Sequence, residues 1–354
     1  MKNFKEALTF DDVLLVPHYS DVRSRKDVSL ITKLSPRRGF ILDIPMLSAN
    51  MDTVTDWPMA MAMAEMGGLG VIHRFMKIER QVEAIARLKE KGLKVGASFG
   101  VKEGEWERVE KSIKAGVDLM VLDIAHGHSI RAIEMIKEFR SRFPNSFLIA
   151  GNVATADGVI DLARAGADAI KVGIGGGSVC ITRMVTGFGV PQITAILGCA
   201  QAAKKMKVGL IADGGIRCSG DIVKALAAGA NAVMIGNILA GTDQTPGDKI
   251  IDQNVCYKQY RGMASLGANL SRSDKNVKSE QLIIEGVSGL VPCRGDVQNI
   301  VRELEGGLRS GLSYAGAHNL EELRRRAHFI KITSAGRVEN LPHDIRWDNN
   351  FQSS

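Results

Sequence analysis

A cysteine behind a glycine-rich segment is the place in this sequence where residue types and spacing could do chemistry. The apolar run 169–172 leads into the glycine-rich segment 173–177, and Ser178, Cys180 and Thr182 follow at once. Glycine lets backbone amides approach an anion closely, and a thiolate favoured by positive charge or backbone dipoles is a covalent nucleophile. The pattern predicts a nucleophile delivered into a loop by a strand. The alternative is a buried, inert cysteine.

The elements that would position this loop are predicted from alternation along the chain. Apolar runs of strand length alternate with segments of helical periodicity, such as 79–91, 130–143 and 154–165. The runs lie at 44–47, 69–72, 95–99, 119–122, 147–150, 169–172, 209–212 and 232–235. Eight strands alternating with helices predict an α/β protein with a TIM (β/α)₈ barrel. A doubly wound open sheet is the alternative.

An internal repeat supports the barrel. The sequences AGVD at 115–118, AGAD at 165–168 and AGAN at 228–231 each close a helical segment and open a strand. Glycine suits the position just after a helix, and Asp or Asn suits the turn into a strand. The repeats are about fifty and sixty residues apart, and each spacing is near two βα units.

Residues that follow the predicted strands would lie together on one face, where barrel enzymes keep their chemistry. Most are polar or glycine: Ser48, Asn50, Met51, His73, Arg74, Asp123, Gly151, Asn152, Asp213, Gly214, Gly215, Gly236 and Asn237. The loops after the seventh and eighth strands of such barrels commonly bind phosphate. We therefore expect a phosphorylated ligand that reaches toward Cys180, with Ser178 and Gly215 close together.

The alternation breaks after residue 240. Residues 242–294 form a long insertion with a predicted hairpin at 249–260 and a polar segment at 271–281. An insertion of this size on the catalytic face indicates a mobile lid after strand eight. Glu285 follows three apolar residues, so it is either a partly desolvated carboxyl suited to proton transfer or a surface loop residue. The tail from 329 onward is expected to be an extra strand or an arm.

Composition narrows the class of protein. The formal charge of +7 is the excess of 46 lysines and arginines over 39 acidic residues, and the basic residues are dispersed, which fits anionic small ligands better than a nucleic-acid surface. No apolar run approaches a membrane span and the first residues are charged, so we expect a cytoplasmic protein. The five cysteines form no C-x-x-C pair, which predicts reduced thiols rather than a disulfide scaffold or a zinc cluster.

Two histidines, His126 and His128, invite a metal interpretation because imidazoles two residues apart can share an ion. No carboxylate and histidine set at other strand ends completes a ligand shell. Positioning of a cofactor, together with Asp123, is the preferred interpretation.

Four stretches make the chain similar to a known family. They are LSANMDTVT (47–55), IKVGIGGGSVCITR (170–183), IADGGIRCSGDIVKALAAGANAVMIGN (211–237) and YRGMAS (260–265). Together they resemble the IMP dehydrogenase/GMP reductase family, and the similarity runs from LTFDDVLLVP (8–17) to ITSAGRVENLPHD (332–344). The resemblance implies one barrel catalytic domain over 1–354, usually a homotetramer, that contains the 242–294 hairpin and lid. Only about twenty residues separate His73 from Val95, so the family's regulatory tandem domains are expected to be absent.

The resemblance also implies a role for each site residue. Cys180 would attack C2 of a purine nucleotide to form a covalent thioimidate, with Thr182 and Glu285 handling the leaving group. The residues implied for the nucleotide are Ser178, Asp213, Gly215, Gly236, Asn237, Met51, Tyr260, Gly262 and Met263. Asp123 and Asn152 would meet the nicotinamide end of NAD(P)(H). Backbone carbonyls of Gly175, Gly177 and Cys180 match a monovalent cation loop for K⁺, although Gly176 stands where proline is usual.

Two reactions share the thioimidate. Lys275 and Asn276 replace the Arg-Tyr pair expected in a dehydrogenase lid, while Thr182 and Glu285 match a reductase. The sequence therefore favours GMP reductase, which converts GMP and NADPH to IMP, ammonia and NADP⁺. IMP dehydrogenase, which converts IMP, NAD⁺ and water to XMP and NADH, is the alternative, because the barrel body looks dehydrogenase-like. A phosphate-ligand-binding barrel without redox turnover is a third interpretation.

Overall fold

The computed structural model describes residues 5–102, 104–272 and 283–342. Within them, parallel strands close into a barrel in the order β10, β11, β4, β5, β6, β7, β8, β9. Their bounds are β4 (Met46–Ser48), β5 (Leu69–Ile72), β6 (Gly96–Phe99), β7 (Leu119–Asp123), β8 (Phe147–Val153), β9 (Ala169–Val172), β10 (Gly209–Asp213) and β11 (Ala232–Ile235). The predicted TIM barrel is confirmed, and the open sheet is excluded.

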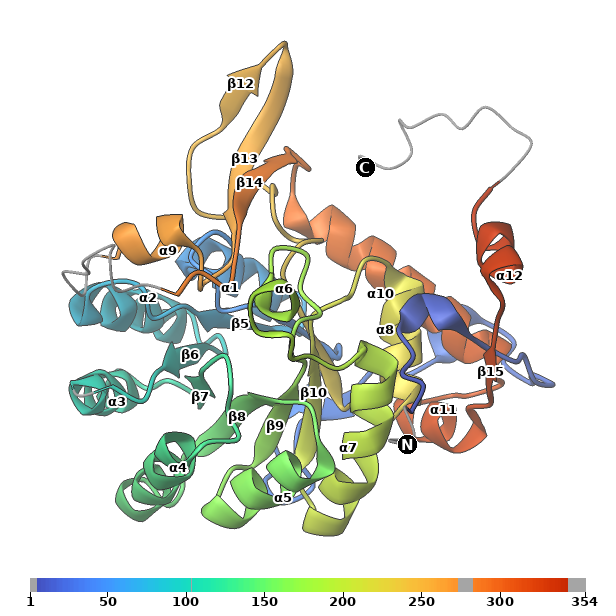
Figure 1. Ribbon diagram of the computed structural model, residues 1–354, viewed down its shortest axis with the longest axis horizontal. Helices are drawn as coiled ribbons and strands as arrows, with labels where there is room; N and C mark the ends of the chain where they lie inside the picture. The colour runs from blue at the N-terminus through green and yellow to red at the C-terminus, as the bar shows by residue number, and fades with distance from the viewer. Residues whose placement is uncertain (1–4, 103, 273–282, 343–354) are drawn as a thin grey trace.

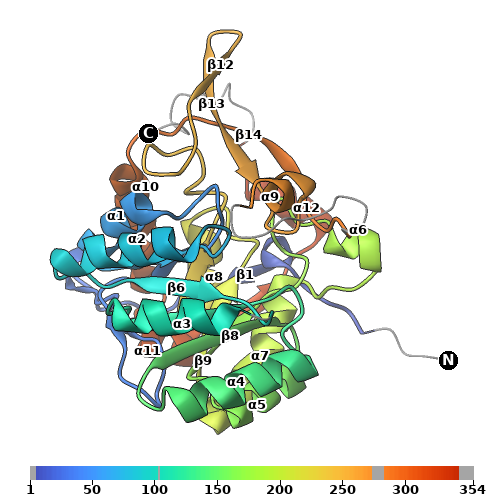
Figure 2. The ribbon, with the colours of Figure 1, turned by 90° about the vertical axis from the view of Figure 1, so that its left-hand side faces the viewer.

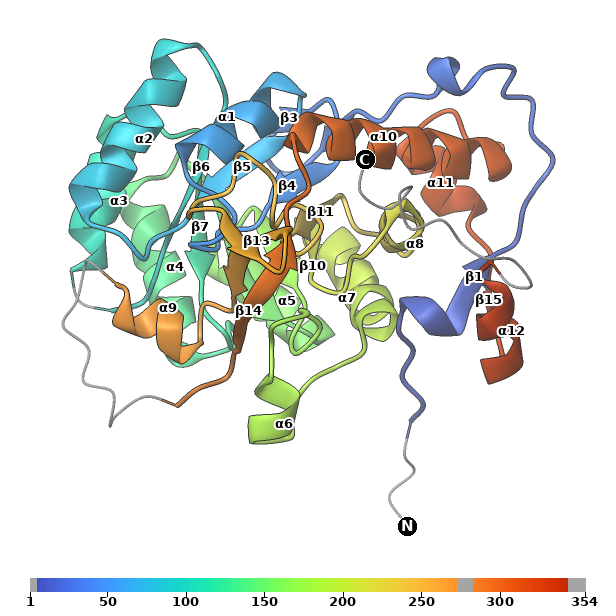
Figure 3. The ribbon, with the colours of Figure 1, turned by 90° about the horizontal axis from the view of Figure 1, so that it is seen from above.

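Helices surround the barrel (Figure 3). They are α1 (Trp57–Glu65), α2 (Ile78–Glu90), α3 (Glu105–Lys114), α4 (Ile130–Arg142), α5 (Ala156–Ala165), α7 (Gln192–Met206), α8 (Ser219–Ala227), α10 (Val297–Tyr314) and α11 (Leu320–Arg326). In α2 the residues 81, 84, 85 and 88 are buried, which is the spacing of one helix face. Figure 2 shows α2, α3, α4 and α5 along the outside of β6, β8 and β9.

The barrel strands have an apolar layer on each side. Leu119 and Val121 of β7 face the barrel interior, where they pack with alternate residues of the other strands. Met120 and Leu122 belong to the larger core between the strands and the helices. Strands buried on both faces have uninterrupted apolar runs, which is why the runs predicted the strands so well.

The internal repeat performs the same local task in each copy. Its glycines have φ of +88°, +122° and +117°, as expected for residues that end helices. Its last residue accepts a hydrogen bond from a backbone N–H at the start of the preceding strand. The pairs are Asp118 with Val95 (2.8 Å), Asp168 with Leu148 (2.9 Å) and Asn231 with Leu210 (3.0 Å).

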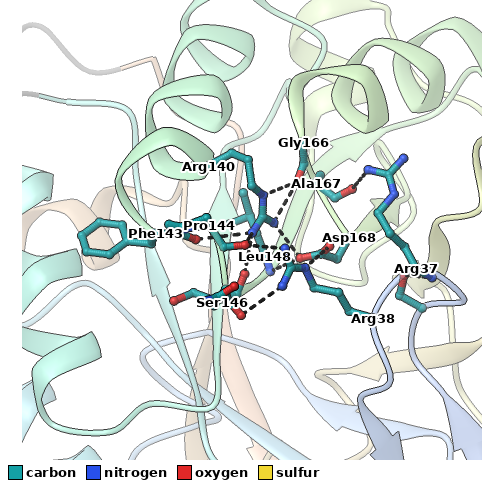
Figure 4. A network of polar contacts seen from close by, with 12 residues as sticks. Arg37, Arg38, Arg140, Phe143, Pro144, Ser146, Leu148, Gly166, Ala167 and Asp168 are labelled. Carbon is teal, nitrogen blue, oxygen red and sulfur yellow. Dashed lines mark hydrogen bonds and ion pairs between the residues drawn. The ribbon is translucent and has the colours of Figure 1, made fainter.

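A polar network lies beside the second repeat, at the start of β9 (Figure 4). It includes Arg38, from the hairpin of β2 (Thr32–Lys33) and β3 (Ile41–Leu42). Its Nε lies 3.0 Å from Asp168 Oδ1, while Arg140 Nη2 lies 2.7 Å from Oδ2. Arg37 donates to the carbonyls of Ala163 and Met206, so the network ties the hairpin to α5 and α7.

We expect Asp168→Ala to lower the free energy of unfolding by about 3 kcal/mol, because it removes a buried partner from two guanidinium groups and from the Leu148 N–H. The matched control is Asp168→Asn, which keeps an acceptor as Asn231 does in the third repeat and should lose less. Urea unfolding of both variants measures the difference. Equal stability of Asp168→Ala and the unaltered protein would contradict this role.

The insertion after β11 rises from the barrel as a small antiparallel sheet (Figure 1). It consists of β12 (Ile250–Asp252), β13 (Val255–Arg261) and β14 (Ser288–Pro292), and a short helix, α9 (Leu266–Leu270), follows β13. Gln253 and Asn254, with φ of 47° and 64°, form the two-residue turn between β12 and β13. Most of the polar segment 271–281, including Lys275 and Asn276, lies outside the described residues.

The expectation of reduced cysteines was wrong for one pair. Cys256 and Cys293 form a disulfide across 37 positions, with a Cα–Cα distance of 5.3 Å. The N–H of Cys293 also donates to the carbonyl of Cys256, so pairing of β13 with the chain after β14 brings the sulfurs together. Cys180, Cys199 and Cys218 are free thiols, and burial raises the pKa of Cys199 to about 12.

The N-terminal arm and the C-terminal segment lie side by side (Figure 3). After η1 (Phe10–Asp12), strand β1 (Val13–Leu15) pairs antiparallel with β15 (Phe329–Lys331), so the tail contains the expected extra strand. Ion pairs between Lys331 and Glu6 and between Arg337 of α12 (Ser334–Glu339) and Asp11 extend the contact. None of the helices in the described part of the chain is long and apolar enough to cross a membrane.

Candidate active site

A cavity of about 570 Å³ lies at the carboxyl ends of the barrel strands. Every residue that the sequence analysis assigned to the site lines it. These are Met51, Asp123, Asn152, Gly175, Gly177, Ser178, Cys180, Thr182, Asp213, Gly215, Gly236, Asn237, Tyr260, Gly262, Met263 and Glu285. Their roles in chemistry remain predictions, but their convergence on one cavity from many separate loops is a fact of the fold.

Two glycine loops meet at the base of this cavity. A Cβ on Gly173 would lie 1.9 Å from the carbonyl oxygen of Asp213, and one on Gly214 would lie 3.2 Å from the amide nitrogen of Gly177. Gly214 and Gly215 also have positive φ, of 97° and 78°, which other residues rarely adopt. The loops after β9 and β10 therefore pack backbone to backbone, and the Ser178 segment lies beside Gly215 as expected. Backbone amides gathered in this way suit an anion.

Cys180 is the first member of a hydrogen-bonded chain of three side chains. Its thiol donates to Thr182 Oγ1 at 3.1 Å, and the Thr182 hydroxyl donates to Glu285 Oε2 at 2.8 Å. Thr182 begins the short helix α6 (Thr182–Thr186), so it is placed by the same loop as the thiol. The carboxylate is 103 positions away from Thr182 in sequence. A proton can pass between the Cys180 thiol and the Glu285 carboxylate through the Thr182 hydroxyl.

Backbone pairing holds Glu285 in place. Its carbonyl accepts from the Ile181 N–H at 2.9 Å, and its N–H donates to the Ala264 carbonyl at 3.1 Å. The next residue, Gly286, forms an antiparallel bridge with Cys180. Antiparallel backbone hydrogen bonds thus join the Cys180 loop to the Glu285 segment, and Ile181 and Ala264 fix the position of Glu285.

The opposite wall of the cavity contains an aromatic and two thioethers. Tyr260 Oη accepts from Ser178 Oγ at 3.5 Å and lies 4.0 Å from Met51 Sδ. Burial raises the pKa of Tyr260, so its hydroxyl stays protonated at neutral pH. A Cβ on Gly236 would lie 3.0 Å from Tyr260 Oη, so only glycine leaves this wall its shape. Met263 completes an apolar surface that suits a flat ring.

Arg261 ties this wall to the loop after β4. Its Nε lies 3.0 Å from Asp52 Oδ2, and its N–H donates to Thr53 Oγ1 at 3.2 Å. The Asp52 N–H lies 3.3 Å from Met263 Sδ. Asp52 therefore joins the loop after β4 to β13.

Comparison with known proteins decides the family. A model of the IMP dehydrogenase / GMP reductase domain matches residues 7–343. The chain belongs to the IMP dehydrogenase/GMP reductase family. Members of this family are NAD(P)-dependent oxidoreductases of purine nucleotides, which confirms the resemblance found in the sequence.

Family members of both activities are similar over nearly their whole length. An inosine-5'-monophosphate dehydrogenase of Cryptosporidium parvum is 43% identical, with 97% of this chain and 96% of the relative covered. A GMP reductase of Leishmania major is 35% identical, with 96% and 97% covered. A crystal structure of a Trypanosoma brucei GMP reductase variant in complex with guanosine 5'-monophosphate superposes with a TM-score of 0.90, at 34% identity and coverage of 97% and 99%.

The cavity is also lined by residues that the sequence analysis did not single out. They include Phe75, Lys102, Asn269 and Arg272, and the Arg272 guanidinium lies 4.0 Å from the Phe75 ring centre. Lys171 was missed as well, although a lysine inside an apolar strand was a signal that could have found it. Arginine and lysine in the lining suit a ligand with phosphate groups.

The two histidines near the site differ in their surroundings. His128 Nε2 lies 2.9 Å from Asp161 Oδ2 of α5, in a half-exposed pair. His126 and His128 are 6.5 Å apart between ring centres. Within the described ranges, no group of three histidine, cysteine or acidic residues could hold a metal ion. Nothing in these contacts assigns either histidine to a cofactor.

Proposed function

We propose that this protein is a GMP reductase that converts GMP, NADPH and two protons to IMP, NADP⁺ and ammonium. The observation that carries the proposal is the hydrogen-bonded chain from Cys180 through Thr182 to Glu285, with links of 3.1 and 2.8 Å. A thiol that becomes a nucleophile needs a proton acceptor, and an amino group that leaves as ammonia needs a proton donor. The Glu285 carboxyl group can serve as both through the Thr182 hydroxyl.

The covalent step begins at Cys180. Its Sγ attacks C2 of the purine while the thiol proton passes to Thr182 and on to Glu285. The C2–N bond to the exocyclic amino group then breaks, and the same relay returns a proton to the leaving nitrogen. This leaves a thioimidate on Cys180. The nicotinamide cofactor supplies hydride to C2 when it is bound, and the C–S bond breaks to release the product.

The other site residues bind and orient the nucleotide. The glycine loops around Gly177 and Gly215, with Ser178, offer donors for the 5′-phosphate. Asp213 is proposed to accept from the ribose hydroxyls. Tyr260, Met51 and Met263 form the apolar wall for the base. Gly236, Asn237 and Gly262 border the same space, as the resemblance implied.

The residues present fit a nicotinamide cofactor beside the nucleotide. Asn152 Oδ1 and Arg74 Nε are buried and have no hydrogen-bond partner among the described residues, although both residues line the cavity. A buried acceptor and a buried donor of this kind suit a polar ligand. We propose that Asp123, Asn152 and Arg74 hold the nicotinamide end, and that NADPH is the donor in the reductase direction.

A dehydrogenase is the second candidate, and a specific observation favours it. Relatives named inosine-5'-monophosphate dehydrogenase include the Cryptosporidium parvum protein at 43% identity and a Nitrosopumilus maritimus protein at 37%. The alignment with the latter spans 473 positions, more than the chain contains, so that relative carries sequence without a counterpart here.

Two assays separate the candidates. The purified protein is mixed with GMP and NADPH, and separately with IMP and NAD⁺, while nicotinamide absorbance is followed. We expect consumption of NADPH in the first assay and release of ammonia in equal amount. Formation of NADH and XMP in the second would make the protein an IMP dehydrogenase. Tight nucleotide binding without turnover in either would indicate a phosphate-binding barrel.

Three further properties belong to the same proposal. We propose a cytoplasmic homotetramer, since relatives of this barrel size assemble in that way by the resemblance stated above. The carbonyls of Gly175, Gly177 and Cys180 are the proposed ligands of K⁺, and the Gly177 carbonyl also accepts the Cys180 N–H at 3.1 Å. With Gly176 in this loop, activity measured in K⁺ and in Li⁺ tests whether the cation is needed.

A further inference from the structure

One buried lysine joins two acidic groups of the cavity. Lys171 is the third residue of β9, where Ala169 faces the barrel interior and Ile170 and Val172 face the outer core. By the alternation of a strand, Lys171 shares the interior side with Ala169. Its side chain is only 3% exposed. The ammonium group therefore lies at the floor of the site, beneath the loop that carries Cys180.

The ammonium nitrogen contacts carboxylates from two other strands. Lys171 Nζ lies 2.7 Å from Asp123 Oδ1 at the end of β7 and 2.6 Å from Asp213 Oδ2 at the end of β10. In the barrel order β7, β8, β9, β10, these carboxylates belong to strands that are not neighbours. Both line the cavity, with side chains 22% and 20% exposed. A single cation thus connects its two sides.

Other contacts leave one oxygen of Asp213 for a ligand. Asn152 Nδ2 donates to Asp213 Oδ2 at 2.9 Å, the same oxygen that Lys171 contacts. Among the described residues, Asp213 Oδ1 has no hydrogen-bond partner. Lys171 and Asn152 together hold one edge of the carboxylate and turn the other toward the cavity.

Asp123 is held from several elements. Besides Lys171 on β9, the charged group that faces it is Arg74 after β5, and Asn50 after β4 donates a hydrogen bond. Asp213 faces Lys171 and, more distantly, Tyr260 of β13. Burial alone would raise the pKa of Asp123, but Lys171 and Arg74 hold it below its usual value. Burial alone would lower the pKa of Lys171, but Asp123 and Asp213 raise it.

We propose that Lys171 is a positioning residue that orients Asp213 toward the nucleotide and Asp123 toward the nicotinamide cofactor, and so couples the two halves of the site. The proposal rests on the proposed function for the identity of the two ligands. A buried ion cluster kept only for stability gains little over apolar residues of the same size. Here Asp123 and Asp213 both line the ligand cavity, so an ammonium group that holds their carboxylates in place has a use in ligand binding.

The test compares Lys171→Met with Lys171→Arg. Without the ammonium group, two carboxylates share the cavity floor, and one of them binds a proton at higher pH than before. In Lys171→Met we therefore expect dissociation constants for GMP and for NADP⁺ that are both about tenfold higher, as for an interaction of about 1.4 kcal/mol. We also expect the acid limb of kcat/KM to move up by about one pH unit or more. Lys171→Arg, which keeps the charge and can donate to both acids, should rescue both properties.

Several outcomes would overturn the proposal. If the pH profile of Lys171→Met coincides with that of the unaltered protein, Lys171 does not position the two acids. If only one of the two ligands binds more weakly, Lys171 does not couple the two halves of the site. If Lys171→Met does not fold, Lys171→Arg decides alone, because its acid limb must then stay within about 0.3 pH unit of the original. Calorimetric binding does not require turnover. Failure of the proposed function, seen as no activity in the unaltered protein, is thus separate from failure here.

Discussion

Loss of turnover by about 10⁴-fold or more is the expected result of Cys180→Ala, because the reaction at C2 has no covalent path without the sulfur. Nucleotide binding should persist, since the glycine loops and Asp213 do not depend on the thiol. Steady-state rates with GMP and NADPH, and calorimetry with GMP, measure the two effects. An active Cys180→Ala protein would defeat the covalent mechanism for reductase and dehydrogenase alike.

The other free thiols provide a matched control. Cys218 is exposed and is not placed in the site, so Cys218→Ala should keep its rate. Cys199 is buried in α7, and its raised pKa of about 12 keeps it a thiol. Alkylation by iodoacetamide should inactivate the Cys218→Ala protein, and saturating GMP should slow that inactivation. Inactivation that GMP does not slow would place the reactive thiol outside the nucleotide site.

Glu285→Gln should lower kcat for GMP reduction by about 10²- to 10⁴-fold, because glutamine cannot take the proton that Thr182 passes on. The amide keeps the size of the side chain and an oxygen that accepts from Thr182. The Michaelis constant for GMP should change little, since the carboxylate is placed for proton transfer rather than for binding. Rates across GMP concentrations separate the two constants.

The hydride step gives an internal control for Glu285→Gln. Run backward from IMP and NADP⁺, that half-reaction forms the thioimidate without any ammonia. Glu285 also takes the thiol proton in this direction, so the single-turnover burst of NADPH should be slower in Glu285→Gln, but by a smaller factor than the full reaction, which needs a further proton for ammonia. An equal loss in the burst and in the full reaction would mean that Glu285 serves only the covalent step or the fold, and not the departure of ammonia.

The barrel was predictable because its signal is local. Each parallel strand is buried on both sides, so a short apolar run is enough to mark it, and six of the eight runs coincide with observed strands to within one residue at each end. The first strand begins at Met46 rather than at residue 44, because Pro45 has no N–H to donate. Strand β14 was not predicted, since its residues are mostly exposed and carry no apolar pattern.

The site residues also divide into those marked by local sequence and those brought together only by the fold. Cys180, Ser178 and Gly215 stand in glycine-rich loops that can be read from the sequence. A lysine inside an apolar strand marks Lys171 as unusual, but its role could not be predicted, because its partner Asp213 is 42 positions away and only the closed barrel brings them together. The same holds for Cys256 and Cys293, which are joined by the pairing of β13 with β14 and not by a spacing that marks a disulfide.

The pairing of β1 with β15 has a consequence for the order in which the protein is made. Glu6 and Lys331 are 325 positions apart, and at about 5–20 residues per second the ribosome needs roughly 15 to 65 seconds to synthesise the chain between them. Until then β1 is a strand edge without its partner. Phe10 lies against Gly215, and Asp11 binds Arg217 at 2.9 Å, so the segment that pairs with β15 also supports the loop after β10, and that support is completed only late in synthesis. The nascent enzyme is thus complete in its barrel before it is complete in its site.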